Sequence, residues 1–172
     1  MPSGRATVVN ATAAALLGLL HSGPMTGGQL VAAAGERFGS VFSVTRSQVY
    51  RELPVLADAG LLTLGRQGPR ASQEYEITAA GKRAFKAWLT GGGGGADALR
   101  SPLVLRLLHA GSLTLRQRVE LVRVSREAYA VRLDTARAAA RGEPDPYRKA
   151  VADFTVAHTR AMVTLLDAIP TA

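Results

Sequence analysis

The first hydrophobic pattern along the chain has the period of a helix. Val9, Ala13, Leu16 and Leu20 follow one another at steps of four, three and four residues, so they lie on one face of a helix. A Gly-Pro pair at residues 23–24 then ends it. The apolar run is broken by polar residues and is shorter than the roughly 18 to 20 residues of a membrane span, so no membrane partner is expected.

A secretory signal is the alternative interpretation of this run. Arg5 precedes it and small residues follow, as in a signal peptide. The one-sided periodicity favours a helix that faces a core instead.

Two helix starts follow, each with the spacing of a capping box. Thr26 and Gln29 can satisfy each other's free backbone amides, which predicts a helix over residues 27–38. Thr45 and Gln48 repeat this arrangement and predict a third helix.

The third helix is expected to end at Gly60, which can take the left-handed conformation of a helix end. Pro54 cannot donate a backbone hydrogen bond inside it, so we expect a kink that leaves residues 45–53 as the regular part. The apolar stripe of this helix consists of Val49, Leu53 and Leu56.

A two-stranded hairpin and a fourth helix follow. Leu62 and Leu64 alternate with polar residues, as do Tyr75 and Ile77, and the segment 66–73 between them holds Gly and Pro. This pattern predicts a hairpin with a basic tip. Thr78 then caps a fourth helix, whose expected inner side carries Phe85, Trp88 and Leu89.

Five consecutive glycines at residues 91–95 mark a boundary, because each carries a large backbone entropy cost in a helix or strand. A phosphate-binding loop is the alternative, but the Lys and Ser or Thr that such a loop needs do not follow. We therefore expect a first domain at 6–90, a Gly-rich linker at 91–98 and a helical domain at 99–170.

The region after the glycines is helical in character. A heptad pattern runs along it and is broken by Arg126, which is costly on a seam unless it pairs with a carboxylate or lies at the edge. Breakers at residues 142–146 separate this helix from a second amphipathic one. The heptad positions are Leu115, Val119, Val122, Arg126, Tyr129, Leu133, Ala136 and Ala140, and those of the second helix are Val151, Thr155, His158, Met162, Leu165 and Ile169.

Two helices with so short a connection are expected to form an antiparallel pair. The pair has little core of its own, so we expect it to pack against a second copy and form a homodimer. The residues predicted for the dimer interface are Leu115, Val119, Val122, Tyr129, Leu133, Met162 and Leu165.

Composition narrows the function. The chain of 172 residues has a net charge of +8, which favours a polyanionic partner such as nucleic acid. It has no cysteine, which excludes disulfides, cysteine-based zinc sites and thiol nucleophiles and fits a reducing cytoplasm. His21, His109 and His158 are too far apart in sequence to suggest a metal site, and no catalytic arrangement or cofactor motif stands out.

The predicted fold class is mainly α with a small β-hairpin. Three helices, a hairpin and a fourth helix form the order of a winged helix-turn-helix, in which the third helix enters the major groove and the hairpin contacts the neighbouring backbone. A C-terminal antiparallel helical domain for dimerisation completes the expected architecture.

The motifs resemble one family in particular. The stretches "ALLGLLHSGPMTGGQLVAAAGERFG", "VTRSQVYRELPVLADAGLL" and "YEITAAGKRAFKAWL" are similar to the PadR family of bacterial transcriptional regulators, over about residues 15–89. The segment "LRSPLVLRLLHAGSLTLRQRVELV" and the helices after it resemble the C-terminal domain through which longer members dimerise. Pro54 departs from the family pattern, as does Phe154, where the family more often has Trp.

The DNA-binding residues are predicted from their place on the winged domain. Arg46 and Ser47 lie in the first turn of the third helix, where their side chains can reach base edges. Thr45 caps that helix, and Tyr50 and Arg51 lie one turn further on, within reach of phosphate oxygens. The hairpin is expected to contact the adjacent backbone or minor groove through Arg66, Gln67 and Arg70.

The resemblance also implies a small planar effector, such as a phenolic acid or a drug-like molecule, bound between the winged domain and the dimerisation helices. Its candidate residues are Phe85, Trp88, Tyr129 and His158. The alternative, which the sequence favours, is that these side chains fill the dimer core.

The function expected from these observations is that of a homodimeric repressor which binds a pseudo-palindromic double-stranded DNA operator and is released by an effector. A winged-helix module that binds proteins and ignores DNA is the main alternative. A small hydrolase or transferase is a third possibility, which no sequence motif supports.

Overall fold

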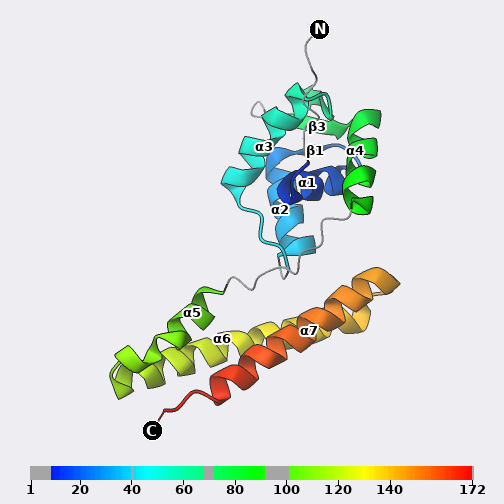
Figure 1. Ribbon diagram of the computed structural model, residues 1–172. Helices are drawn as coiled ribbons and strands as arrows, with labels where there is room; N and C mark the ends of the chain where they lie inside the picture. The colour runs from blue at the N-terminus through cyan, green and yellow to red at the C-terminus, as the bar shows by residue number, and fades with distance from the viewer. Residues whose placement is uncertain (1–8, 40, 68–71, 92–100, 172) are drawn as a thin grey trace. The chain divides into compact units, whose positions relative to one another are not determined.

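The computed structural model describes residues 9–39, 41–67, 72–91 and 101–171, which belong to two compact units, Met1–Gly95 and Ala96–Ala172 (Figure 1). Each unit has its own secondary structure. The first contains α1 (Ala11–Leu20), β1 (Met25–Thr26), α2 (Gly27–Phe38), α3 (Arg46–Asp58), β2 (Leu62–Gln67), β3 (Gln73–Ile77) and α4 (Ala79–Thr90). The second contains α5 (Pro102–Leu108), the short 3₁₀ helix η2 (Ala110–Ser112), α6 (Leu115–Gly142) and α7 (Pro146–Asp167).

The first helix lies at the centre of the first unit. α1 packs against α2, α3 and α4, and Figure 1 shows it enclosed by them. The prediction that Ala13, Leu16 and Leu20 face a core is confirmed, and Leu17 and Leu19 are buried as well. The helix is therefore buried on more than the one face that its periodicity predicted.

Both predicted capping boxes are present. Thr26 starts α2 and Thr45 starts α3, each with reciprocal hydrogen bonds to the glutamine three residues later. The helix expected over residues 27–38 has those bounds.

The third helix ends where predicted, at Gly60, and its regular part is longer than predicted. Gly60 takes a φ of 69°, and the amides of Gly60 and Leu61 donate to the carbonyls of Ala57 and Leu56 at 2.9 Å each. These two bonds form a Schellman end. The regular part was expected to stop at residue 53, but helical structure continues past Pro54 to Asp58.

The sheet has three strands in the order β1-β3-β2, so the predicted two-stranded hairpin omitted β1. The predicted partners are confirmed, since Leu62 is opposite Ile77 and Leu64 is opposite Tyr75. The expected tip at residues 66–73 is shorter than predicted, because β2 continues to Gln67 and β3 starts at Gln73. The added strand is two residues long and pairs Met25 with Tyr75.

The start of the fourth helix is fixed closely to the segment just before β2. The Thr78 hydroxyl accepts from the amide of Gly81 at 3.0 Å and donates to the carbonyl of Gly60 at 2.8 Å. A Cβ at Gly81 would lie 2.2 Å from the carbonyl oxygen of Leu61, so only glycine fits there. Phe85 packs on the core as expected, whereas Trp88 and Leu89 are 41% and 59% exposed and are not buried in it.

The second unit is built on the predicted antiparallel pair. α6 and α7 lie side by side along their length (Figure 1), and Arg118 near the start of α6 donates to the carbonyl of Pro170 after α7. Arg126, the exception in the heptad pattern, pairs with Asp167 at the exposed edge of this pair. The hydrogen bond that Arg126 donates to the Asp167 carboxylate raises the pKa of Arg126.

The residues predicted for the dimer interface separate into three groups by burial. Val122, Leu133 and Met162 are buried within the single chain, whereas Leu115 and Val119 are 50% and 41% exposed. Tyr129 and Leu165 are half-buried.

Most of the linker predicted at 91–98 lies outside the described residues. A search of the described helices for one long and apolar enough to cross a membrane finds none.

Candidate nucleic-acid interface

The N-terminal turn of α3 presents polar side chains outside the core. Thr45, Arg46 and Ser47 are exposed, whereas Val49 in the next turn is fully buried. The Thr45 amide donates to Gln48 Oε1 at 2.8 Å, and the Gln48 amide donates back to Thr45 Oγ1 at 3.3 Å. The capping box therefore fixes the turn that carries the predicted base-contacting residues.

Arg46 and Tyr50 form a pair on the exposed side of this helix. The guanidinium of Arg46 lies over the Tyr50 ring, 5.2 Å from its centroid, in a cation–π arrangement. The ring also packs against the first residue of α2, because a Cβ at Gly27 would lie 2.9 Å from Tyr50 Cε1. Gly27 thus leaves room for Tyr50, and Tyr50 in turn supports Arg46.

Arg51 lies beside a buried carboxylate. Its side chain is 69% exposed, and its Nη2 is 3.7 Å from Glu52 Oε1. Glu52 is 8% exposed, and both of its carboxylate oxygens accept from Asn10 Nδ2, at 3.3 and 3.4 Å.

The hairpin supplies a second group of polar side chains. Arg66 and Gln67 at the end of β2 are exposed. Gln73 at the start of β3 donates to the carbonyls of Gly65 and Glu74, at 3.1 and 2.8 Å. Arg70, the third predicted hairpin contact, lies outside the described residues.

We call the set Thr45, Arg46, Ser47, Tyr50 and Arg51 the recognition face. Its members come from one helical stretch, are all exposed, and offer guanidinium and hydroxyl groups. Such groups can donate to base edges and to phosphate oxygens.

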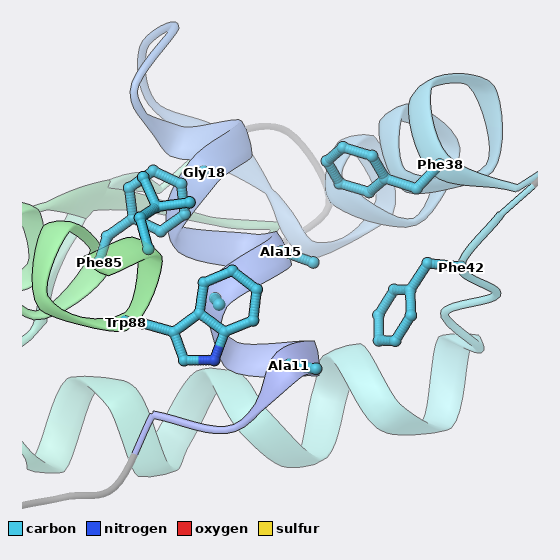
Figure 2. A pocket seen from close by; sticks show the side chains of 9 residues that line it. Ala11, Ala15, Gly18, Phe38, Phe42, Phe85 and Trp88 are labelled. Atoms are coloured by element: carbon cyan, nitrogen blue, oxygen red, sulfur yellow. The ribbon is translucent and has the colours of Figure 1, made fainter. Parts of the chain in front are cut away.

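Two of the four candidate effector residues line a pocket in the first unit. Phe85 and Trp88 of α4 face Ala11, Ala15 and Gly18 of α1 across a cavity of about 330 Å³ (Figure 2). All of its lining side chains are apolar except for the indole nitrogen of Trp88. The full lining is Ala11, Ala14, Ala15, Gly18, Phe38, Phe42, Phe85, Trp88 and Leu89.

The other two candidates belong to the second unit and do not line this pocket. His158 stacks on Phe154, with ring centroids 6.0 Å apart, and Tyr129 lies beneath Arg132. Phe85 and Trp88 thus share one pocket within the first unit, and a common effector site that also includes Tyr129 and His158 stays a prediction.

The sequence analysis missed several residues that shape these sites. Phe38 and Phe42 complete the pocket, and their only sequence signal is a pair of aromatics around the connection from α2 to α3. Gly27 and Asn10 carry no recognisable signal, since their roles depend on contacts with residues far along the chain. Among the described residues, no group of three or more His, Cys, Asp or Glu could hold a metal ion.

A scan against family models matches residues 16–87 to the transcriptional regulator PadR-like family. The matched segment contains α2, α3 and all three strands, together with the second half of α1 and most of α4. Residues 16–87 of the chain therefore match a PadR-like transcriptional regulator domain.

One curated relative supports this assignment by sequence. Over 78 residues the chain is 35% identical to the negative transcriptional regulator PadR of Bacillus subtilis. The match covers 44% of this chain and 43% of that protein, so it spans less than half of either.

Solved structures extend the likeness of fold beyond the PadR-like domain. Bacillus subtilis PadR in complex with operator DNA matches with a TM-score of 0.74 at 23% identity, covering 91% of this chain and 95% of that chain. The same protein in complex with p-coumaric acid matches with a TM-score of 0.69 at 22% identity, covering 91% and 94%. The fold of both units is therefore that of the PadR regulators.

Proposed function

We propose that the protein is a sequence-specific transcriptional repressor of the PadR type that binds a pseudo-palindromic operator as a homodimer. The observation that carries this proposal is the recognition face: Arg46, Ser47 and Arg51 are exposed on a capped helix inside a PadR-like domain. Side chains in the first turn of such a helix reach base edges, and those one turn further on reach phosphates.

The roles within the recognition face follow from side-chain chemistry. Arg46 can hold a guanine through two hydrogen bonds, and Ser47 can serve several bases. Thr45, Tyr50 and Arg51 contact the phosphate backbone, while Arg66, Gln67 and Arg70 of the hairpin contact the adjacent backbone or minor groove. These contacts would take place in the cytoplasm, the compartment that holds the chromosome in the bacterium of the matched relative.

The homodimer is proposed from apolar surface on the second unit. Leu115 and Val119 remain largely exposed on α6, as do Leu108 on α5 and Phe154 on α7. An exposed apolar surface on a paired helix is typical of a dimer interface. A dimer would present two recognition faces to the two half-sites of one operator.

A small-molecule effector is the second element of the proposal. The pocket between α1 and α4 has the volume of a ligand site and an almost wholly apolar lining that includes Phe85 and Trp88. p-Coumaric acid, the planar aromatic molecule that accompanies the similar Bacillus subtilis structure, is the first compound to test. We propose a binding protein and not an enzyme, since the roles of the recognition face and the pocket need no reaction.

Selection of bound fragments from genomic DNA tests the proposed function. The wild-type chain is expected to enrich fragments that share one pseudo-palindromic sequence, and a variant carrying both R46A and R51A is expected to lose this enrichment. Arg83→Ala, which removes an exposed arginine of α4 outside the recognition face, serves as the control and should enrich like the wild type. If no shared sequence appears, or if R46A/R51A enriches it equally, the alternative of a protein-binding module replaces this proposal.

A further inference from the structure

Glu52 is the one acidic residue of the described chain whose side chain is buried. It lies in the middle of α3, one residue after Arg51 and two after Tyr50. A carboxylate removed from water is costly unless polar groups satisfy it. The groups that bind the Glu52 carboxylate therefore indicate its role in the fold.

Asn10 is the main partner, and it has two tasks at once. Its Oδ1 accepts from the amide of Ala13 at 2.8 Å and so caps α1, while its Nδ2 donates to both oxygens of Glu52. One side chain thus links the first turn of the central helix to the middle of α3. The guanidinium of Arg51 lies 3.7 Å from Glu52 Oε1, which is one of the two oxygens that accept from Asn10.

We infer that Glu52 is a positioning residue for DNA recognition, which holds α3 to α1 through Asn10 and keeps Arg51 at the edge of the recognition face. This inference rests on the proposed function. Glu52 itself is buried and contacts no DNA. It acts by fixing the orientation of α3, on which the alignment of Arg46 and Ser47 with base edges depends.

Substitutions at Asn10 and Glu52 can distinguish this positioning role from a general contribution to stability. Asn10→Asp keeps the helix cap, because Asp caps as well as Asn, but it places a second carboxylate against Glu52. Adding Glu52→Gln restores a hydrogen bond between the two side chains with donor and acceptor exchanged, because the glutamine amide can donate to the new aspartate.

The readout is the ratio of affinities for a fragment selected from the genome and for a random duplex of the same length. Loss of folding lowers both affinities by the same factor and leaves this ratio unchanged. Loss of helix orientation lowers mainly the affinity for the selected fragment, since random DNA is held by phosphate contacts. Thermal unfolding, followed by circular dichroism, gives the folded fraction of each variant.

We expect N10D to lower this ratio by about tenfold, the scale of one lost hydrogen bond to a charged group. The double variant N10D/E52Q should return to within about twofold of the wild type, since the two changes are coupled. An unchanged ratio in folded N10D, or a double variant as poor as N10D, would overturn the positioning role. A wild-type protein without any preference for the selected fragment would instead refute the proposed function itself.

Discussion

Gly27 and Tyr50 show how a single side-chain position affects the recognition face. A methyl group on Gly27 would meet the outer atoms of the Tyr50 ring at 2.9 to 3.1 Å. These atoms lie at the free end of a movable side chain, so the ring can move away at small cost. Such a change therefore affects the position of Arg46, which stacks on that ring, more than it affects the stability of the fold.

Gly27→Ala is expected to weaken DNA binding severalfold with little change in melting temperature. The added methyl displaces the Tyr50 ring and removes the support of Arg46, an interaction worth about 0.5–1 kcal/mol at an exposed site. Fluorescence anisotropy with a labelled selected fragment measures the affinity. Gly28→Ala is the matched control, because its methyl would meet only Thr26 Oγ1 at 4.0 Å. Equal affinities of the two variants would contradict the role of Tyr50.

Gly81 differs from Gly27, because its nearest neighbours include backbone atoms, which cannot move away. A methyl group there would lie 2.2 Å from the Leu61 carbonyl oxygen and 2.8 Å from Ile77 Cγ1. Gly81→Ala is expected to destabilise the first unit by about 1–3 kcal/mol, the usual cost of overpacking. Gly35→Ala, in open space inside α2, is expected to stabilise it by about 0.5–1 kcal/mol. Urea unfolding of both variants measures the difference, and a neutral Gly81→Ala would contradict the close packing of α4 against Leu61 and Ile77.

At the scale of elements, α3 and the hairpin are proposed to bind DNA in different ways. α3 is fixed at both ends, by a capping box at Thr45 and a Schellman end at Gly60. The hairpin is a short antiparallel pair that ends in exposed polar residues. A rigid helix suits base readout, and a polar hairpin suits contact with the backbone.

Arg46→Ala and Arg66→Ala are expected to give different binding profiles. Loss of Arg46 should reduce discrimination between the selected fragment and single-base variants by about 1–3 kcal/mol. Loss of Arg66 should weaken binding to all sequences alike and reduce the slope of log K against log salt by about one. Titrations at several salt concentrations separate the two effects. Identical profiles would contradict the division of roles.

Most elements were predictable from sequence because local signals define them. Capping boxes at Thr26 and Thr45 fixed helix starts, and alternation fixed the register of β2 and β3. β1 was missed because two residues show no periodicity, and it exists only through pairing with β3. The prediction ended the regular part of α3 at residue 53, but helical structure continues past Pro54 because packing outweighs the lost backbone hydrogen bond.

The candidate site was predictable only where one element carries it. The recognition face lies on consecutive turns of α3, so helical spacing alone could group its members. The pocket joins α1, α4 and the segment after α2, and the Asn10–Glu52 link spans 42 residues. Such long-range contacts leave no pattern in a single sequence.

At the scale of the whole molecule, two recognition faces have to act together. Leu133, a candidate interface residue, is buried within one chain, so its substitution would disrupt the α6–α7 pair itself. Val119 is a better probe, because it lies on the predicted seam and is 41% exposed.

Val119→Glu is expected to convert the dimer to a monomer, because an unpaired charge in a buried seam is strongly unfavourable. Val131→Glu is the control, since Val131 is 68% exposed and lies on the other side of α6 from the seam. Sedimentation velocity measures the mass of each variant. A persisting dimer of Val119→Glu, or a monomeric wild type, would contradict the proposed interface.

The central claim is that a dimer of this chain reads DNA through two copies of α3. Hydroxyl-radical footprinting of the wild-type protein on a selected genomic fragment tests it most directly. Two protected stretches are expected, with centres about 10 base pairs apart or a multiple of that distance. The same footprint should disappear in the R46A/R51A variant. Protection of one stretch alone, or uniform protection that survives the loss of both arginines, would contradict the claim.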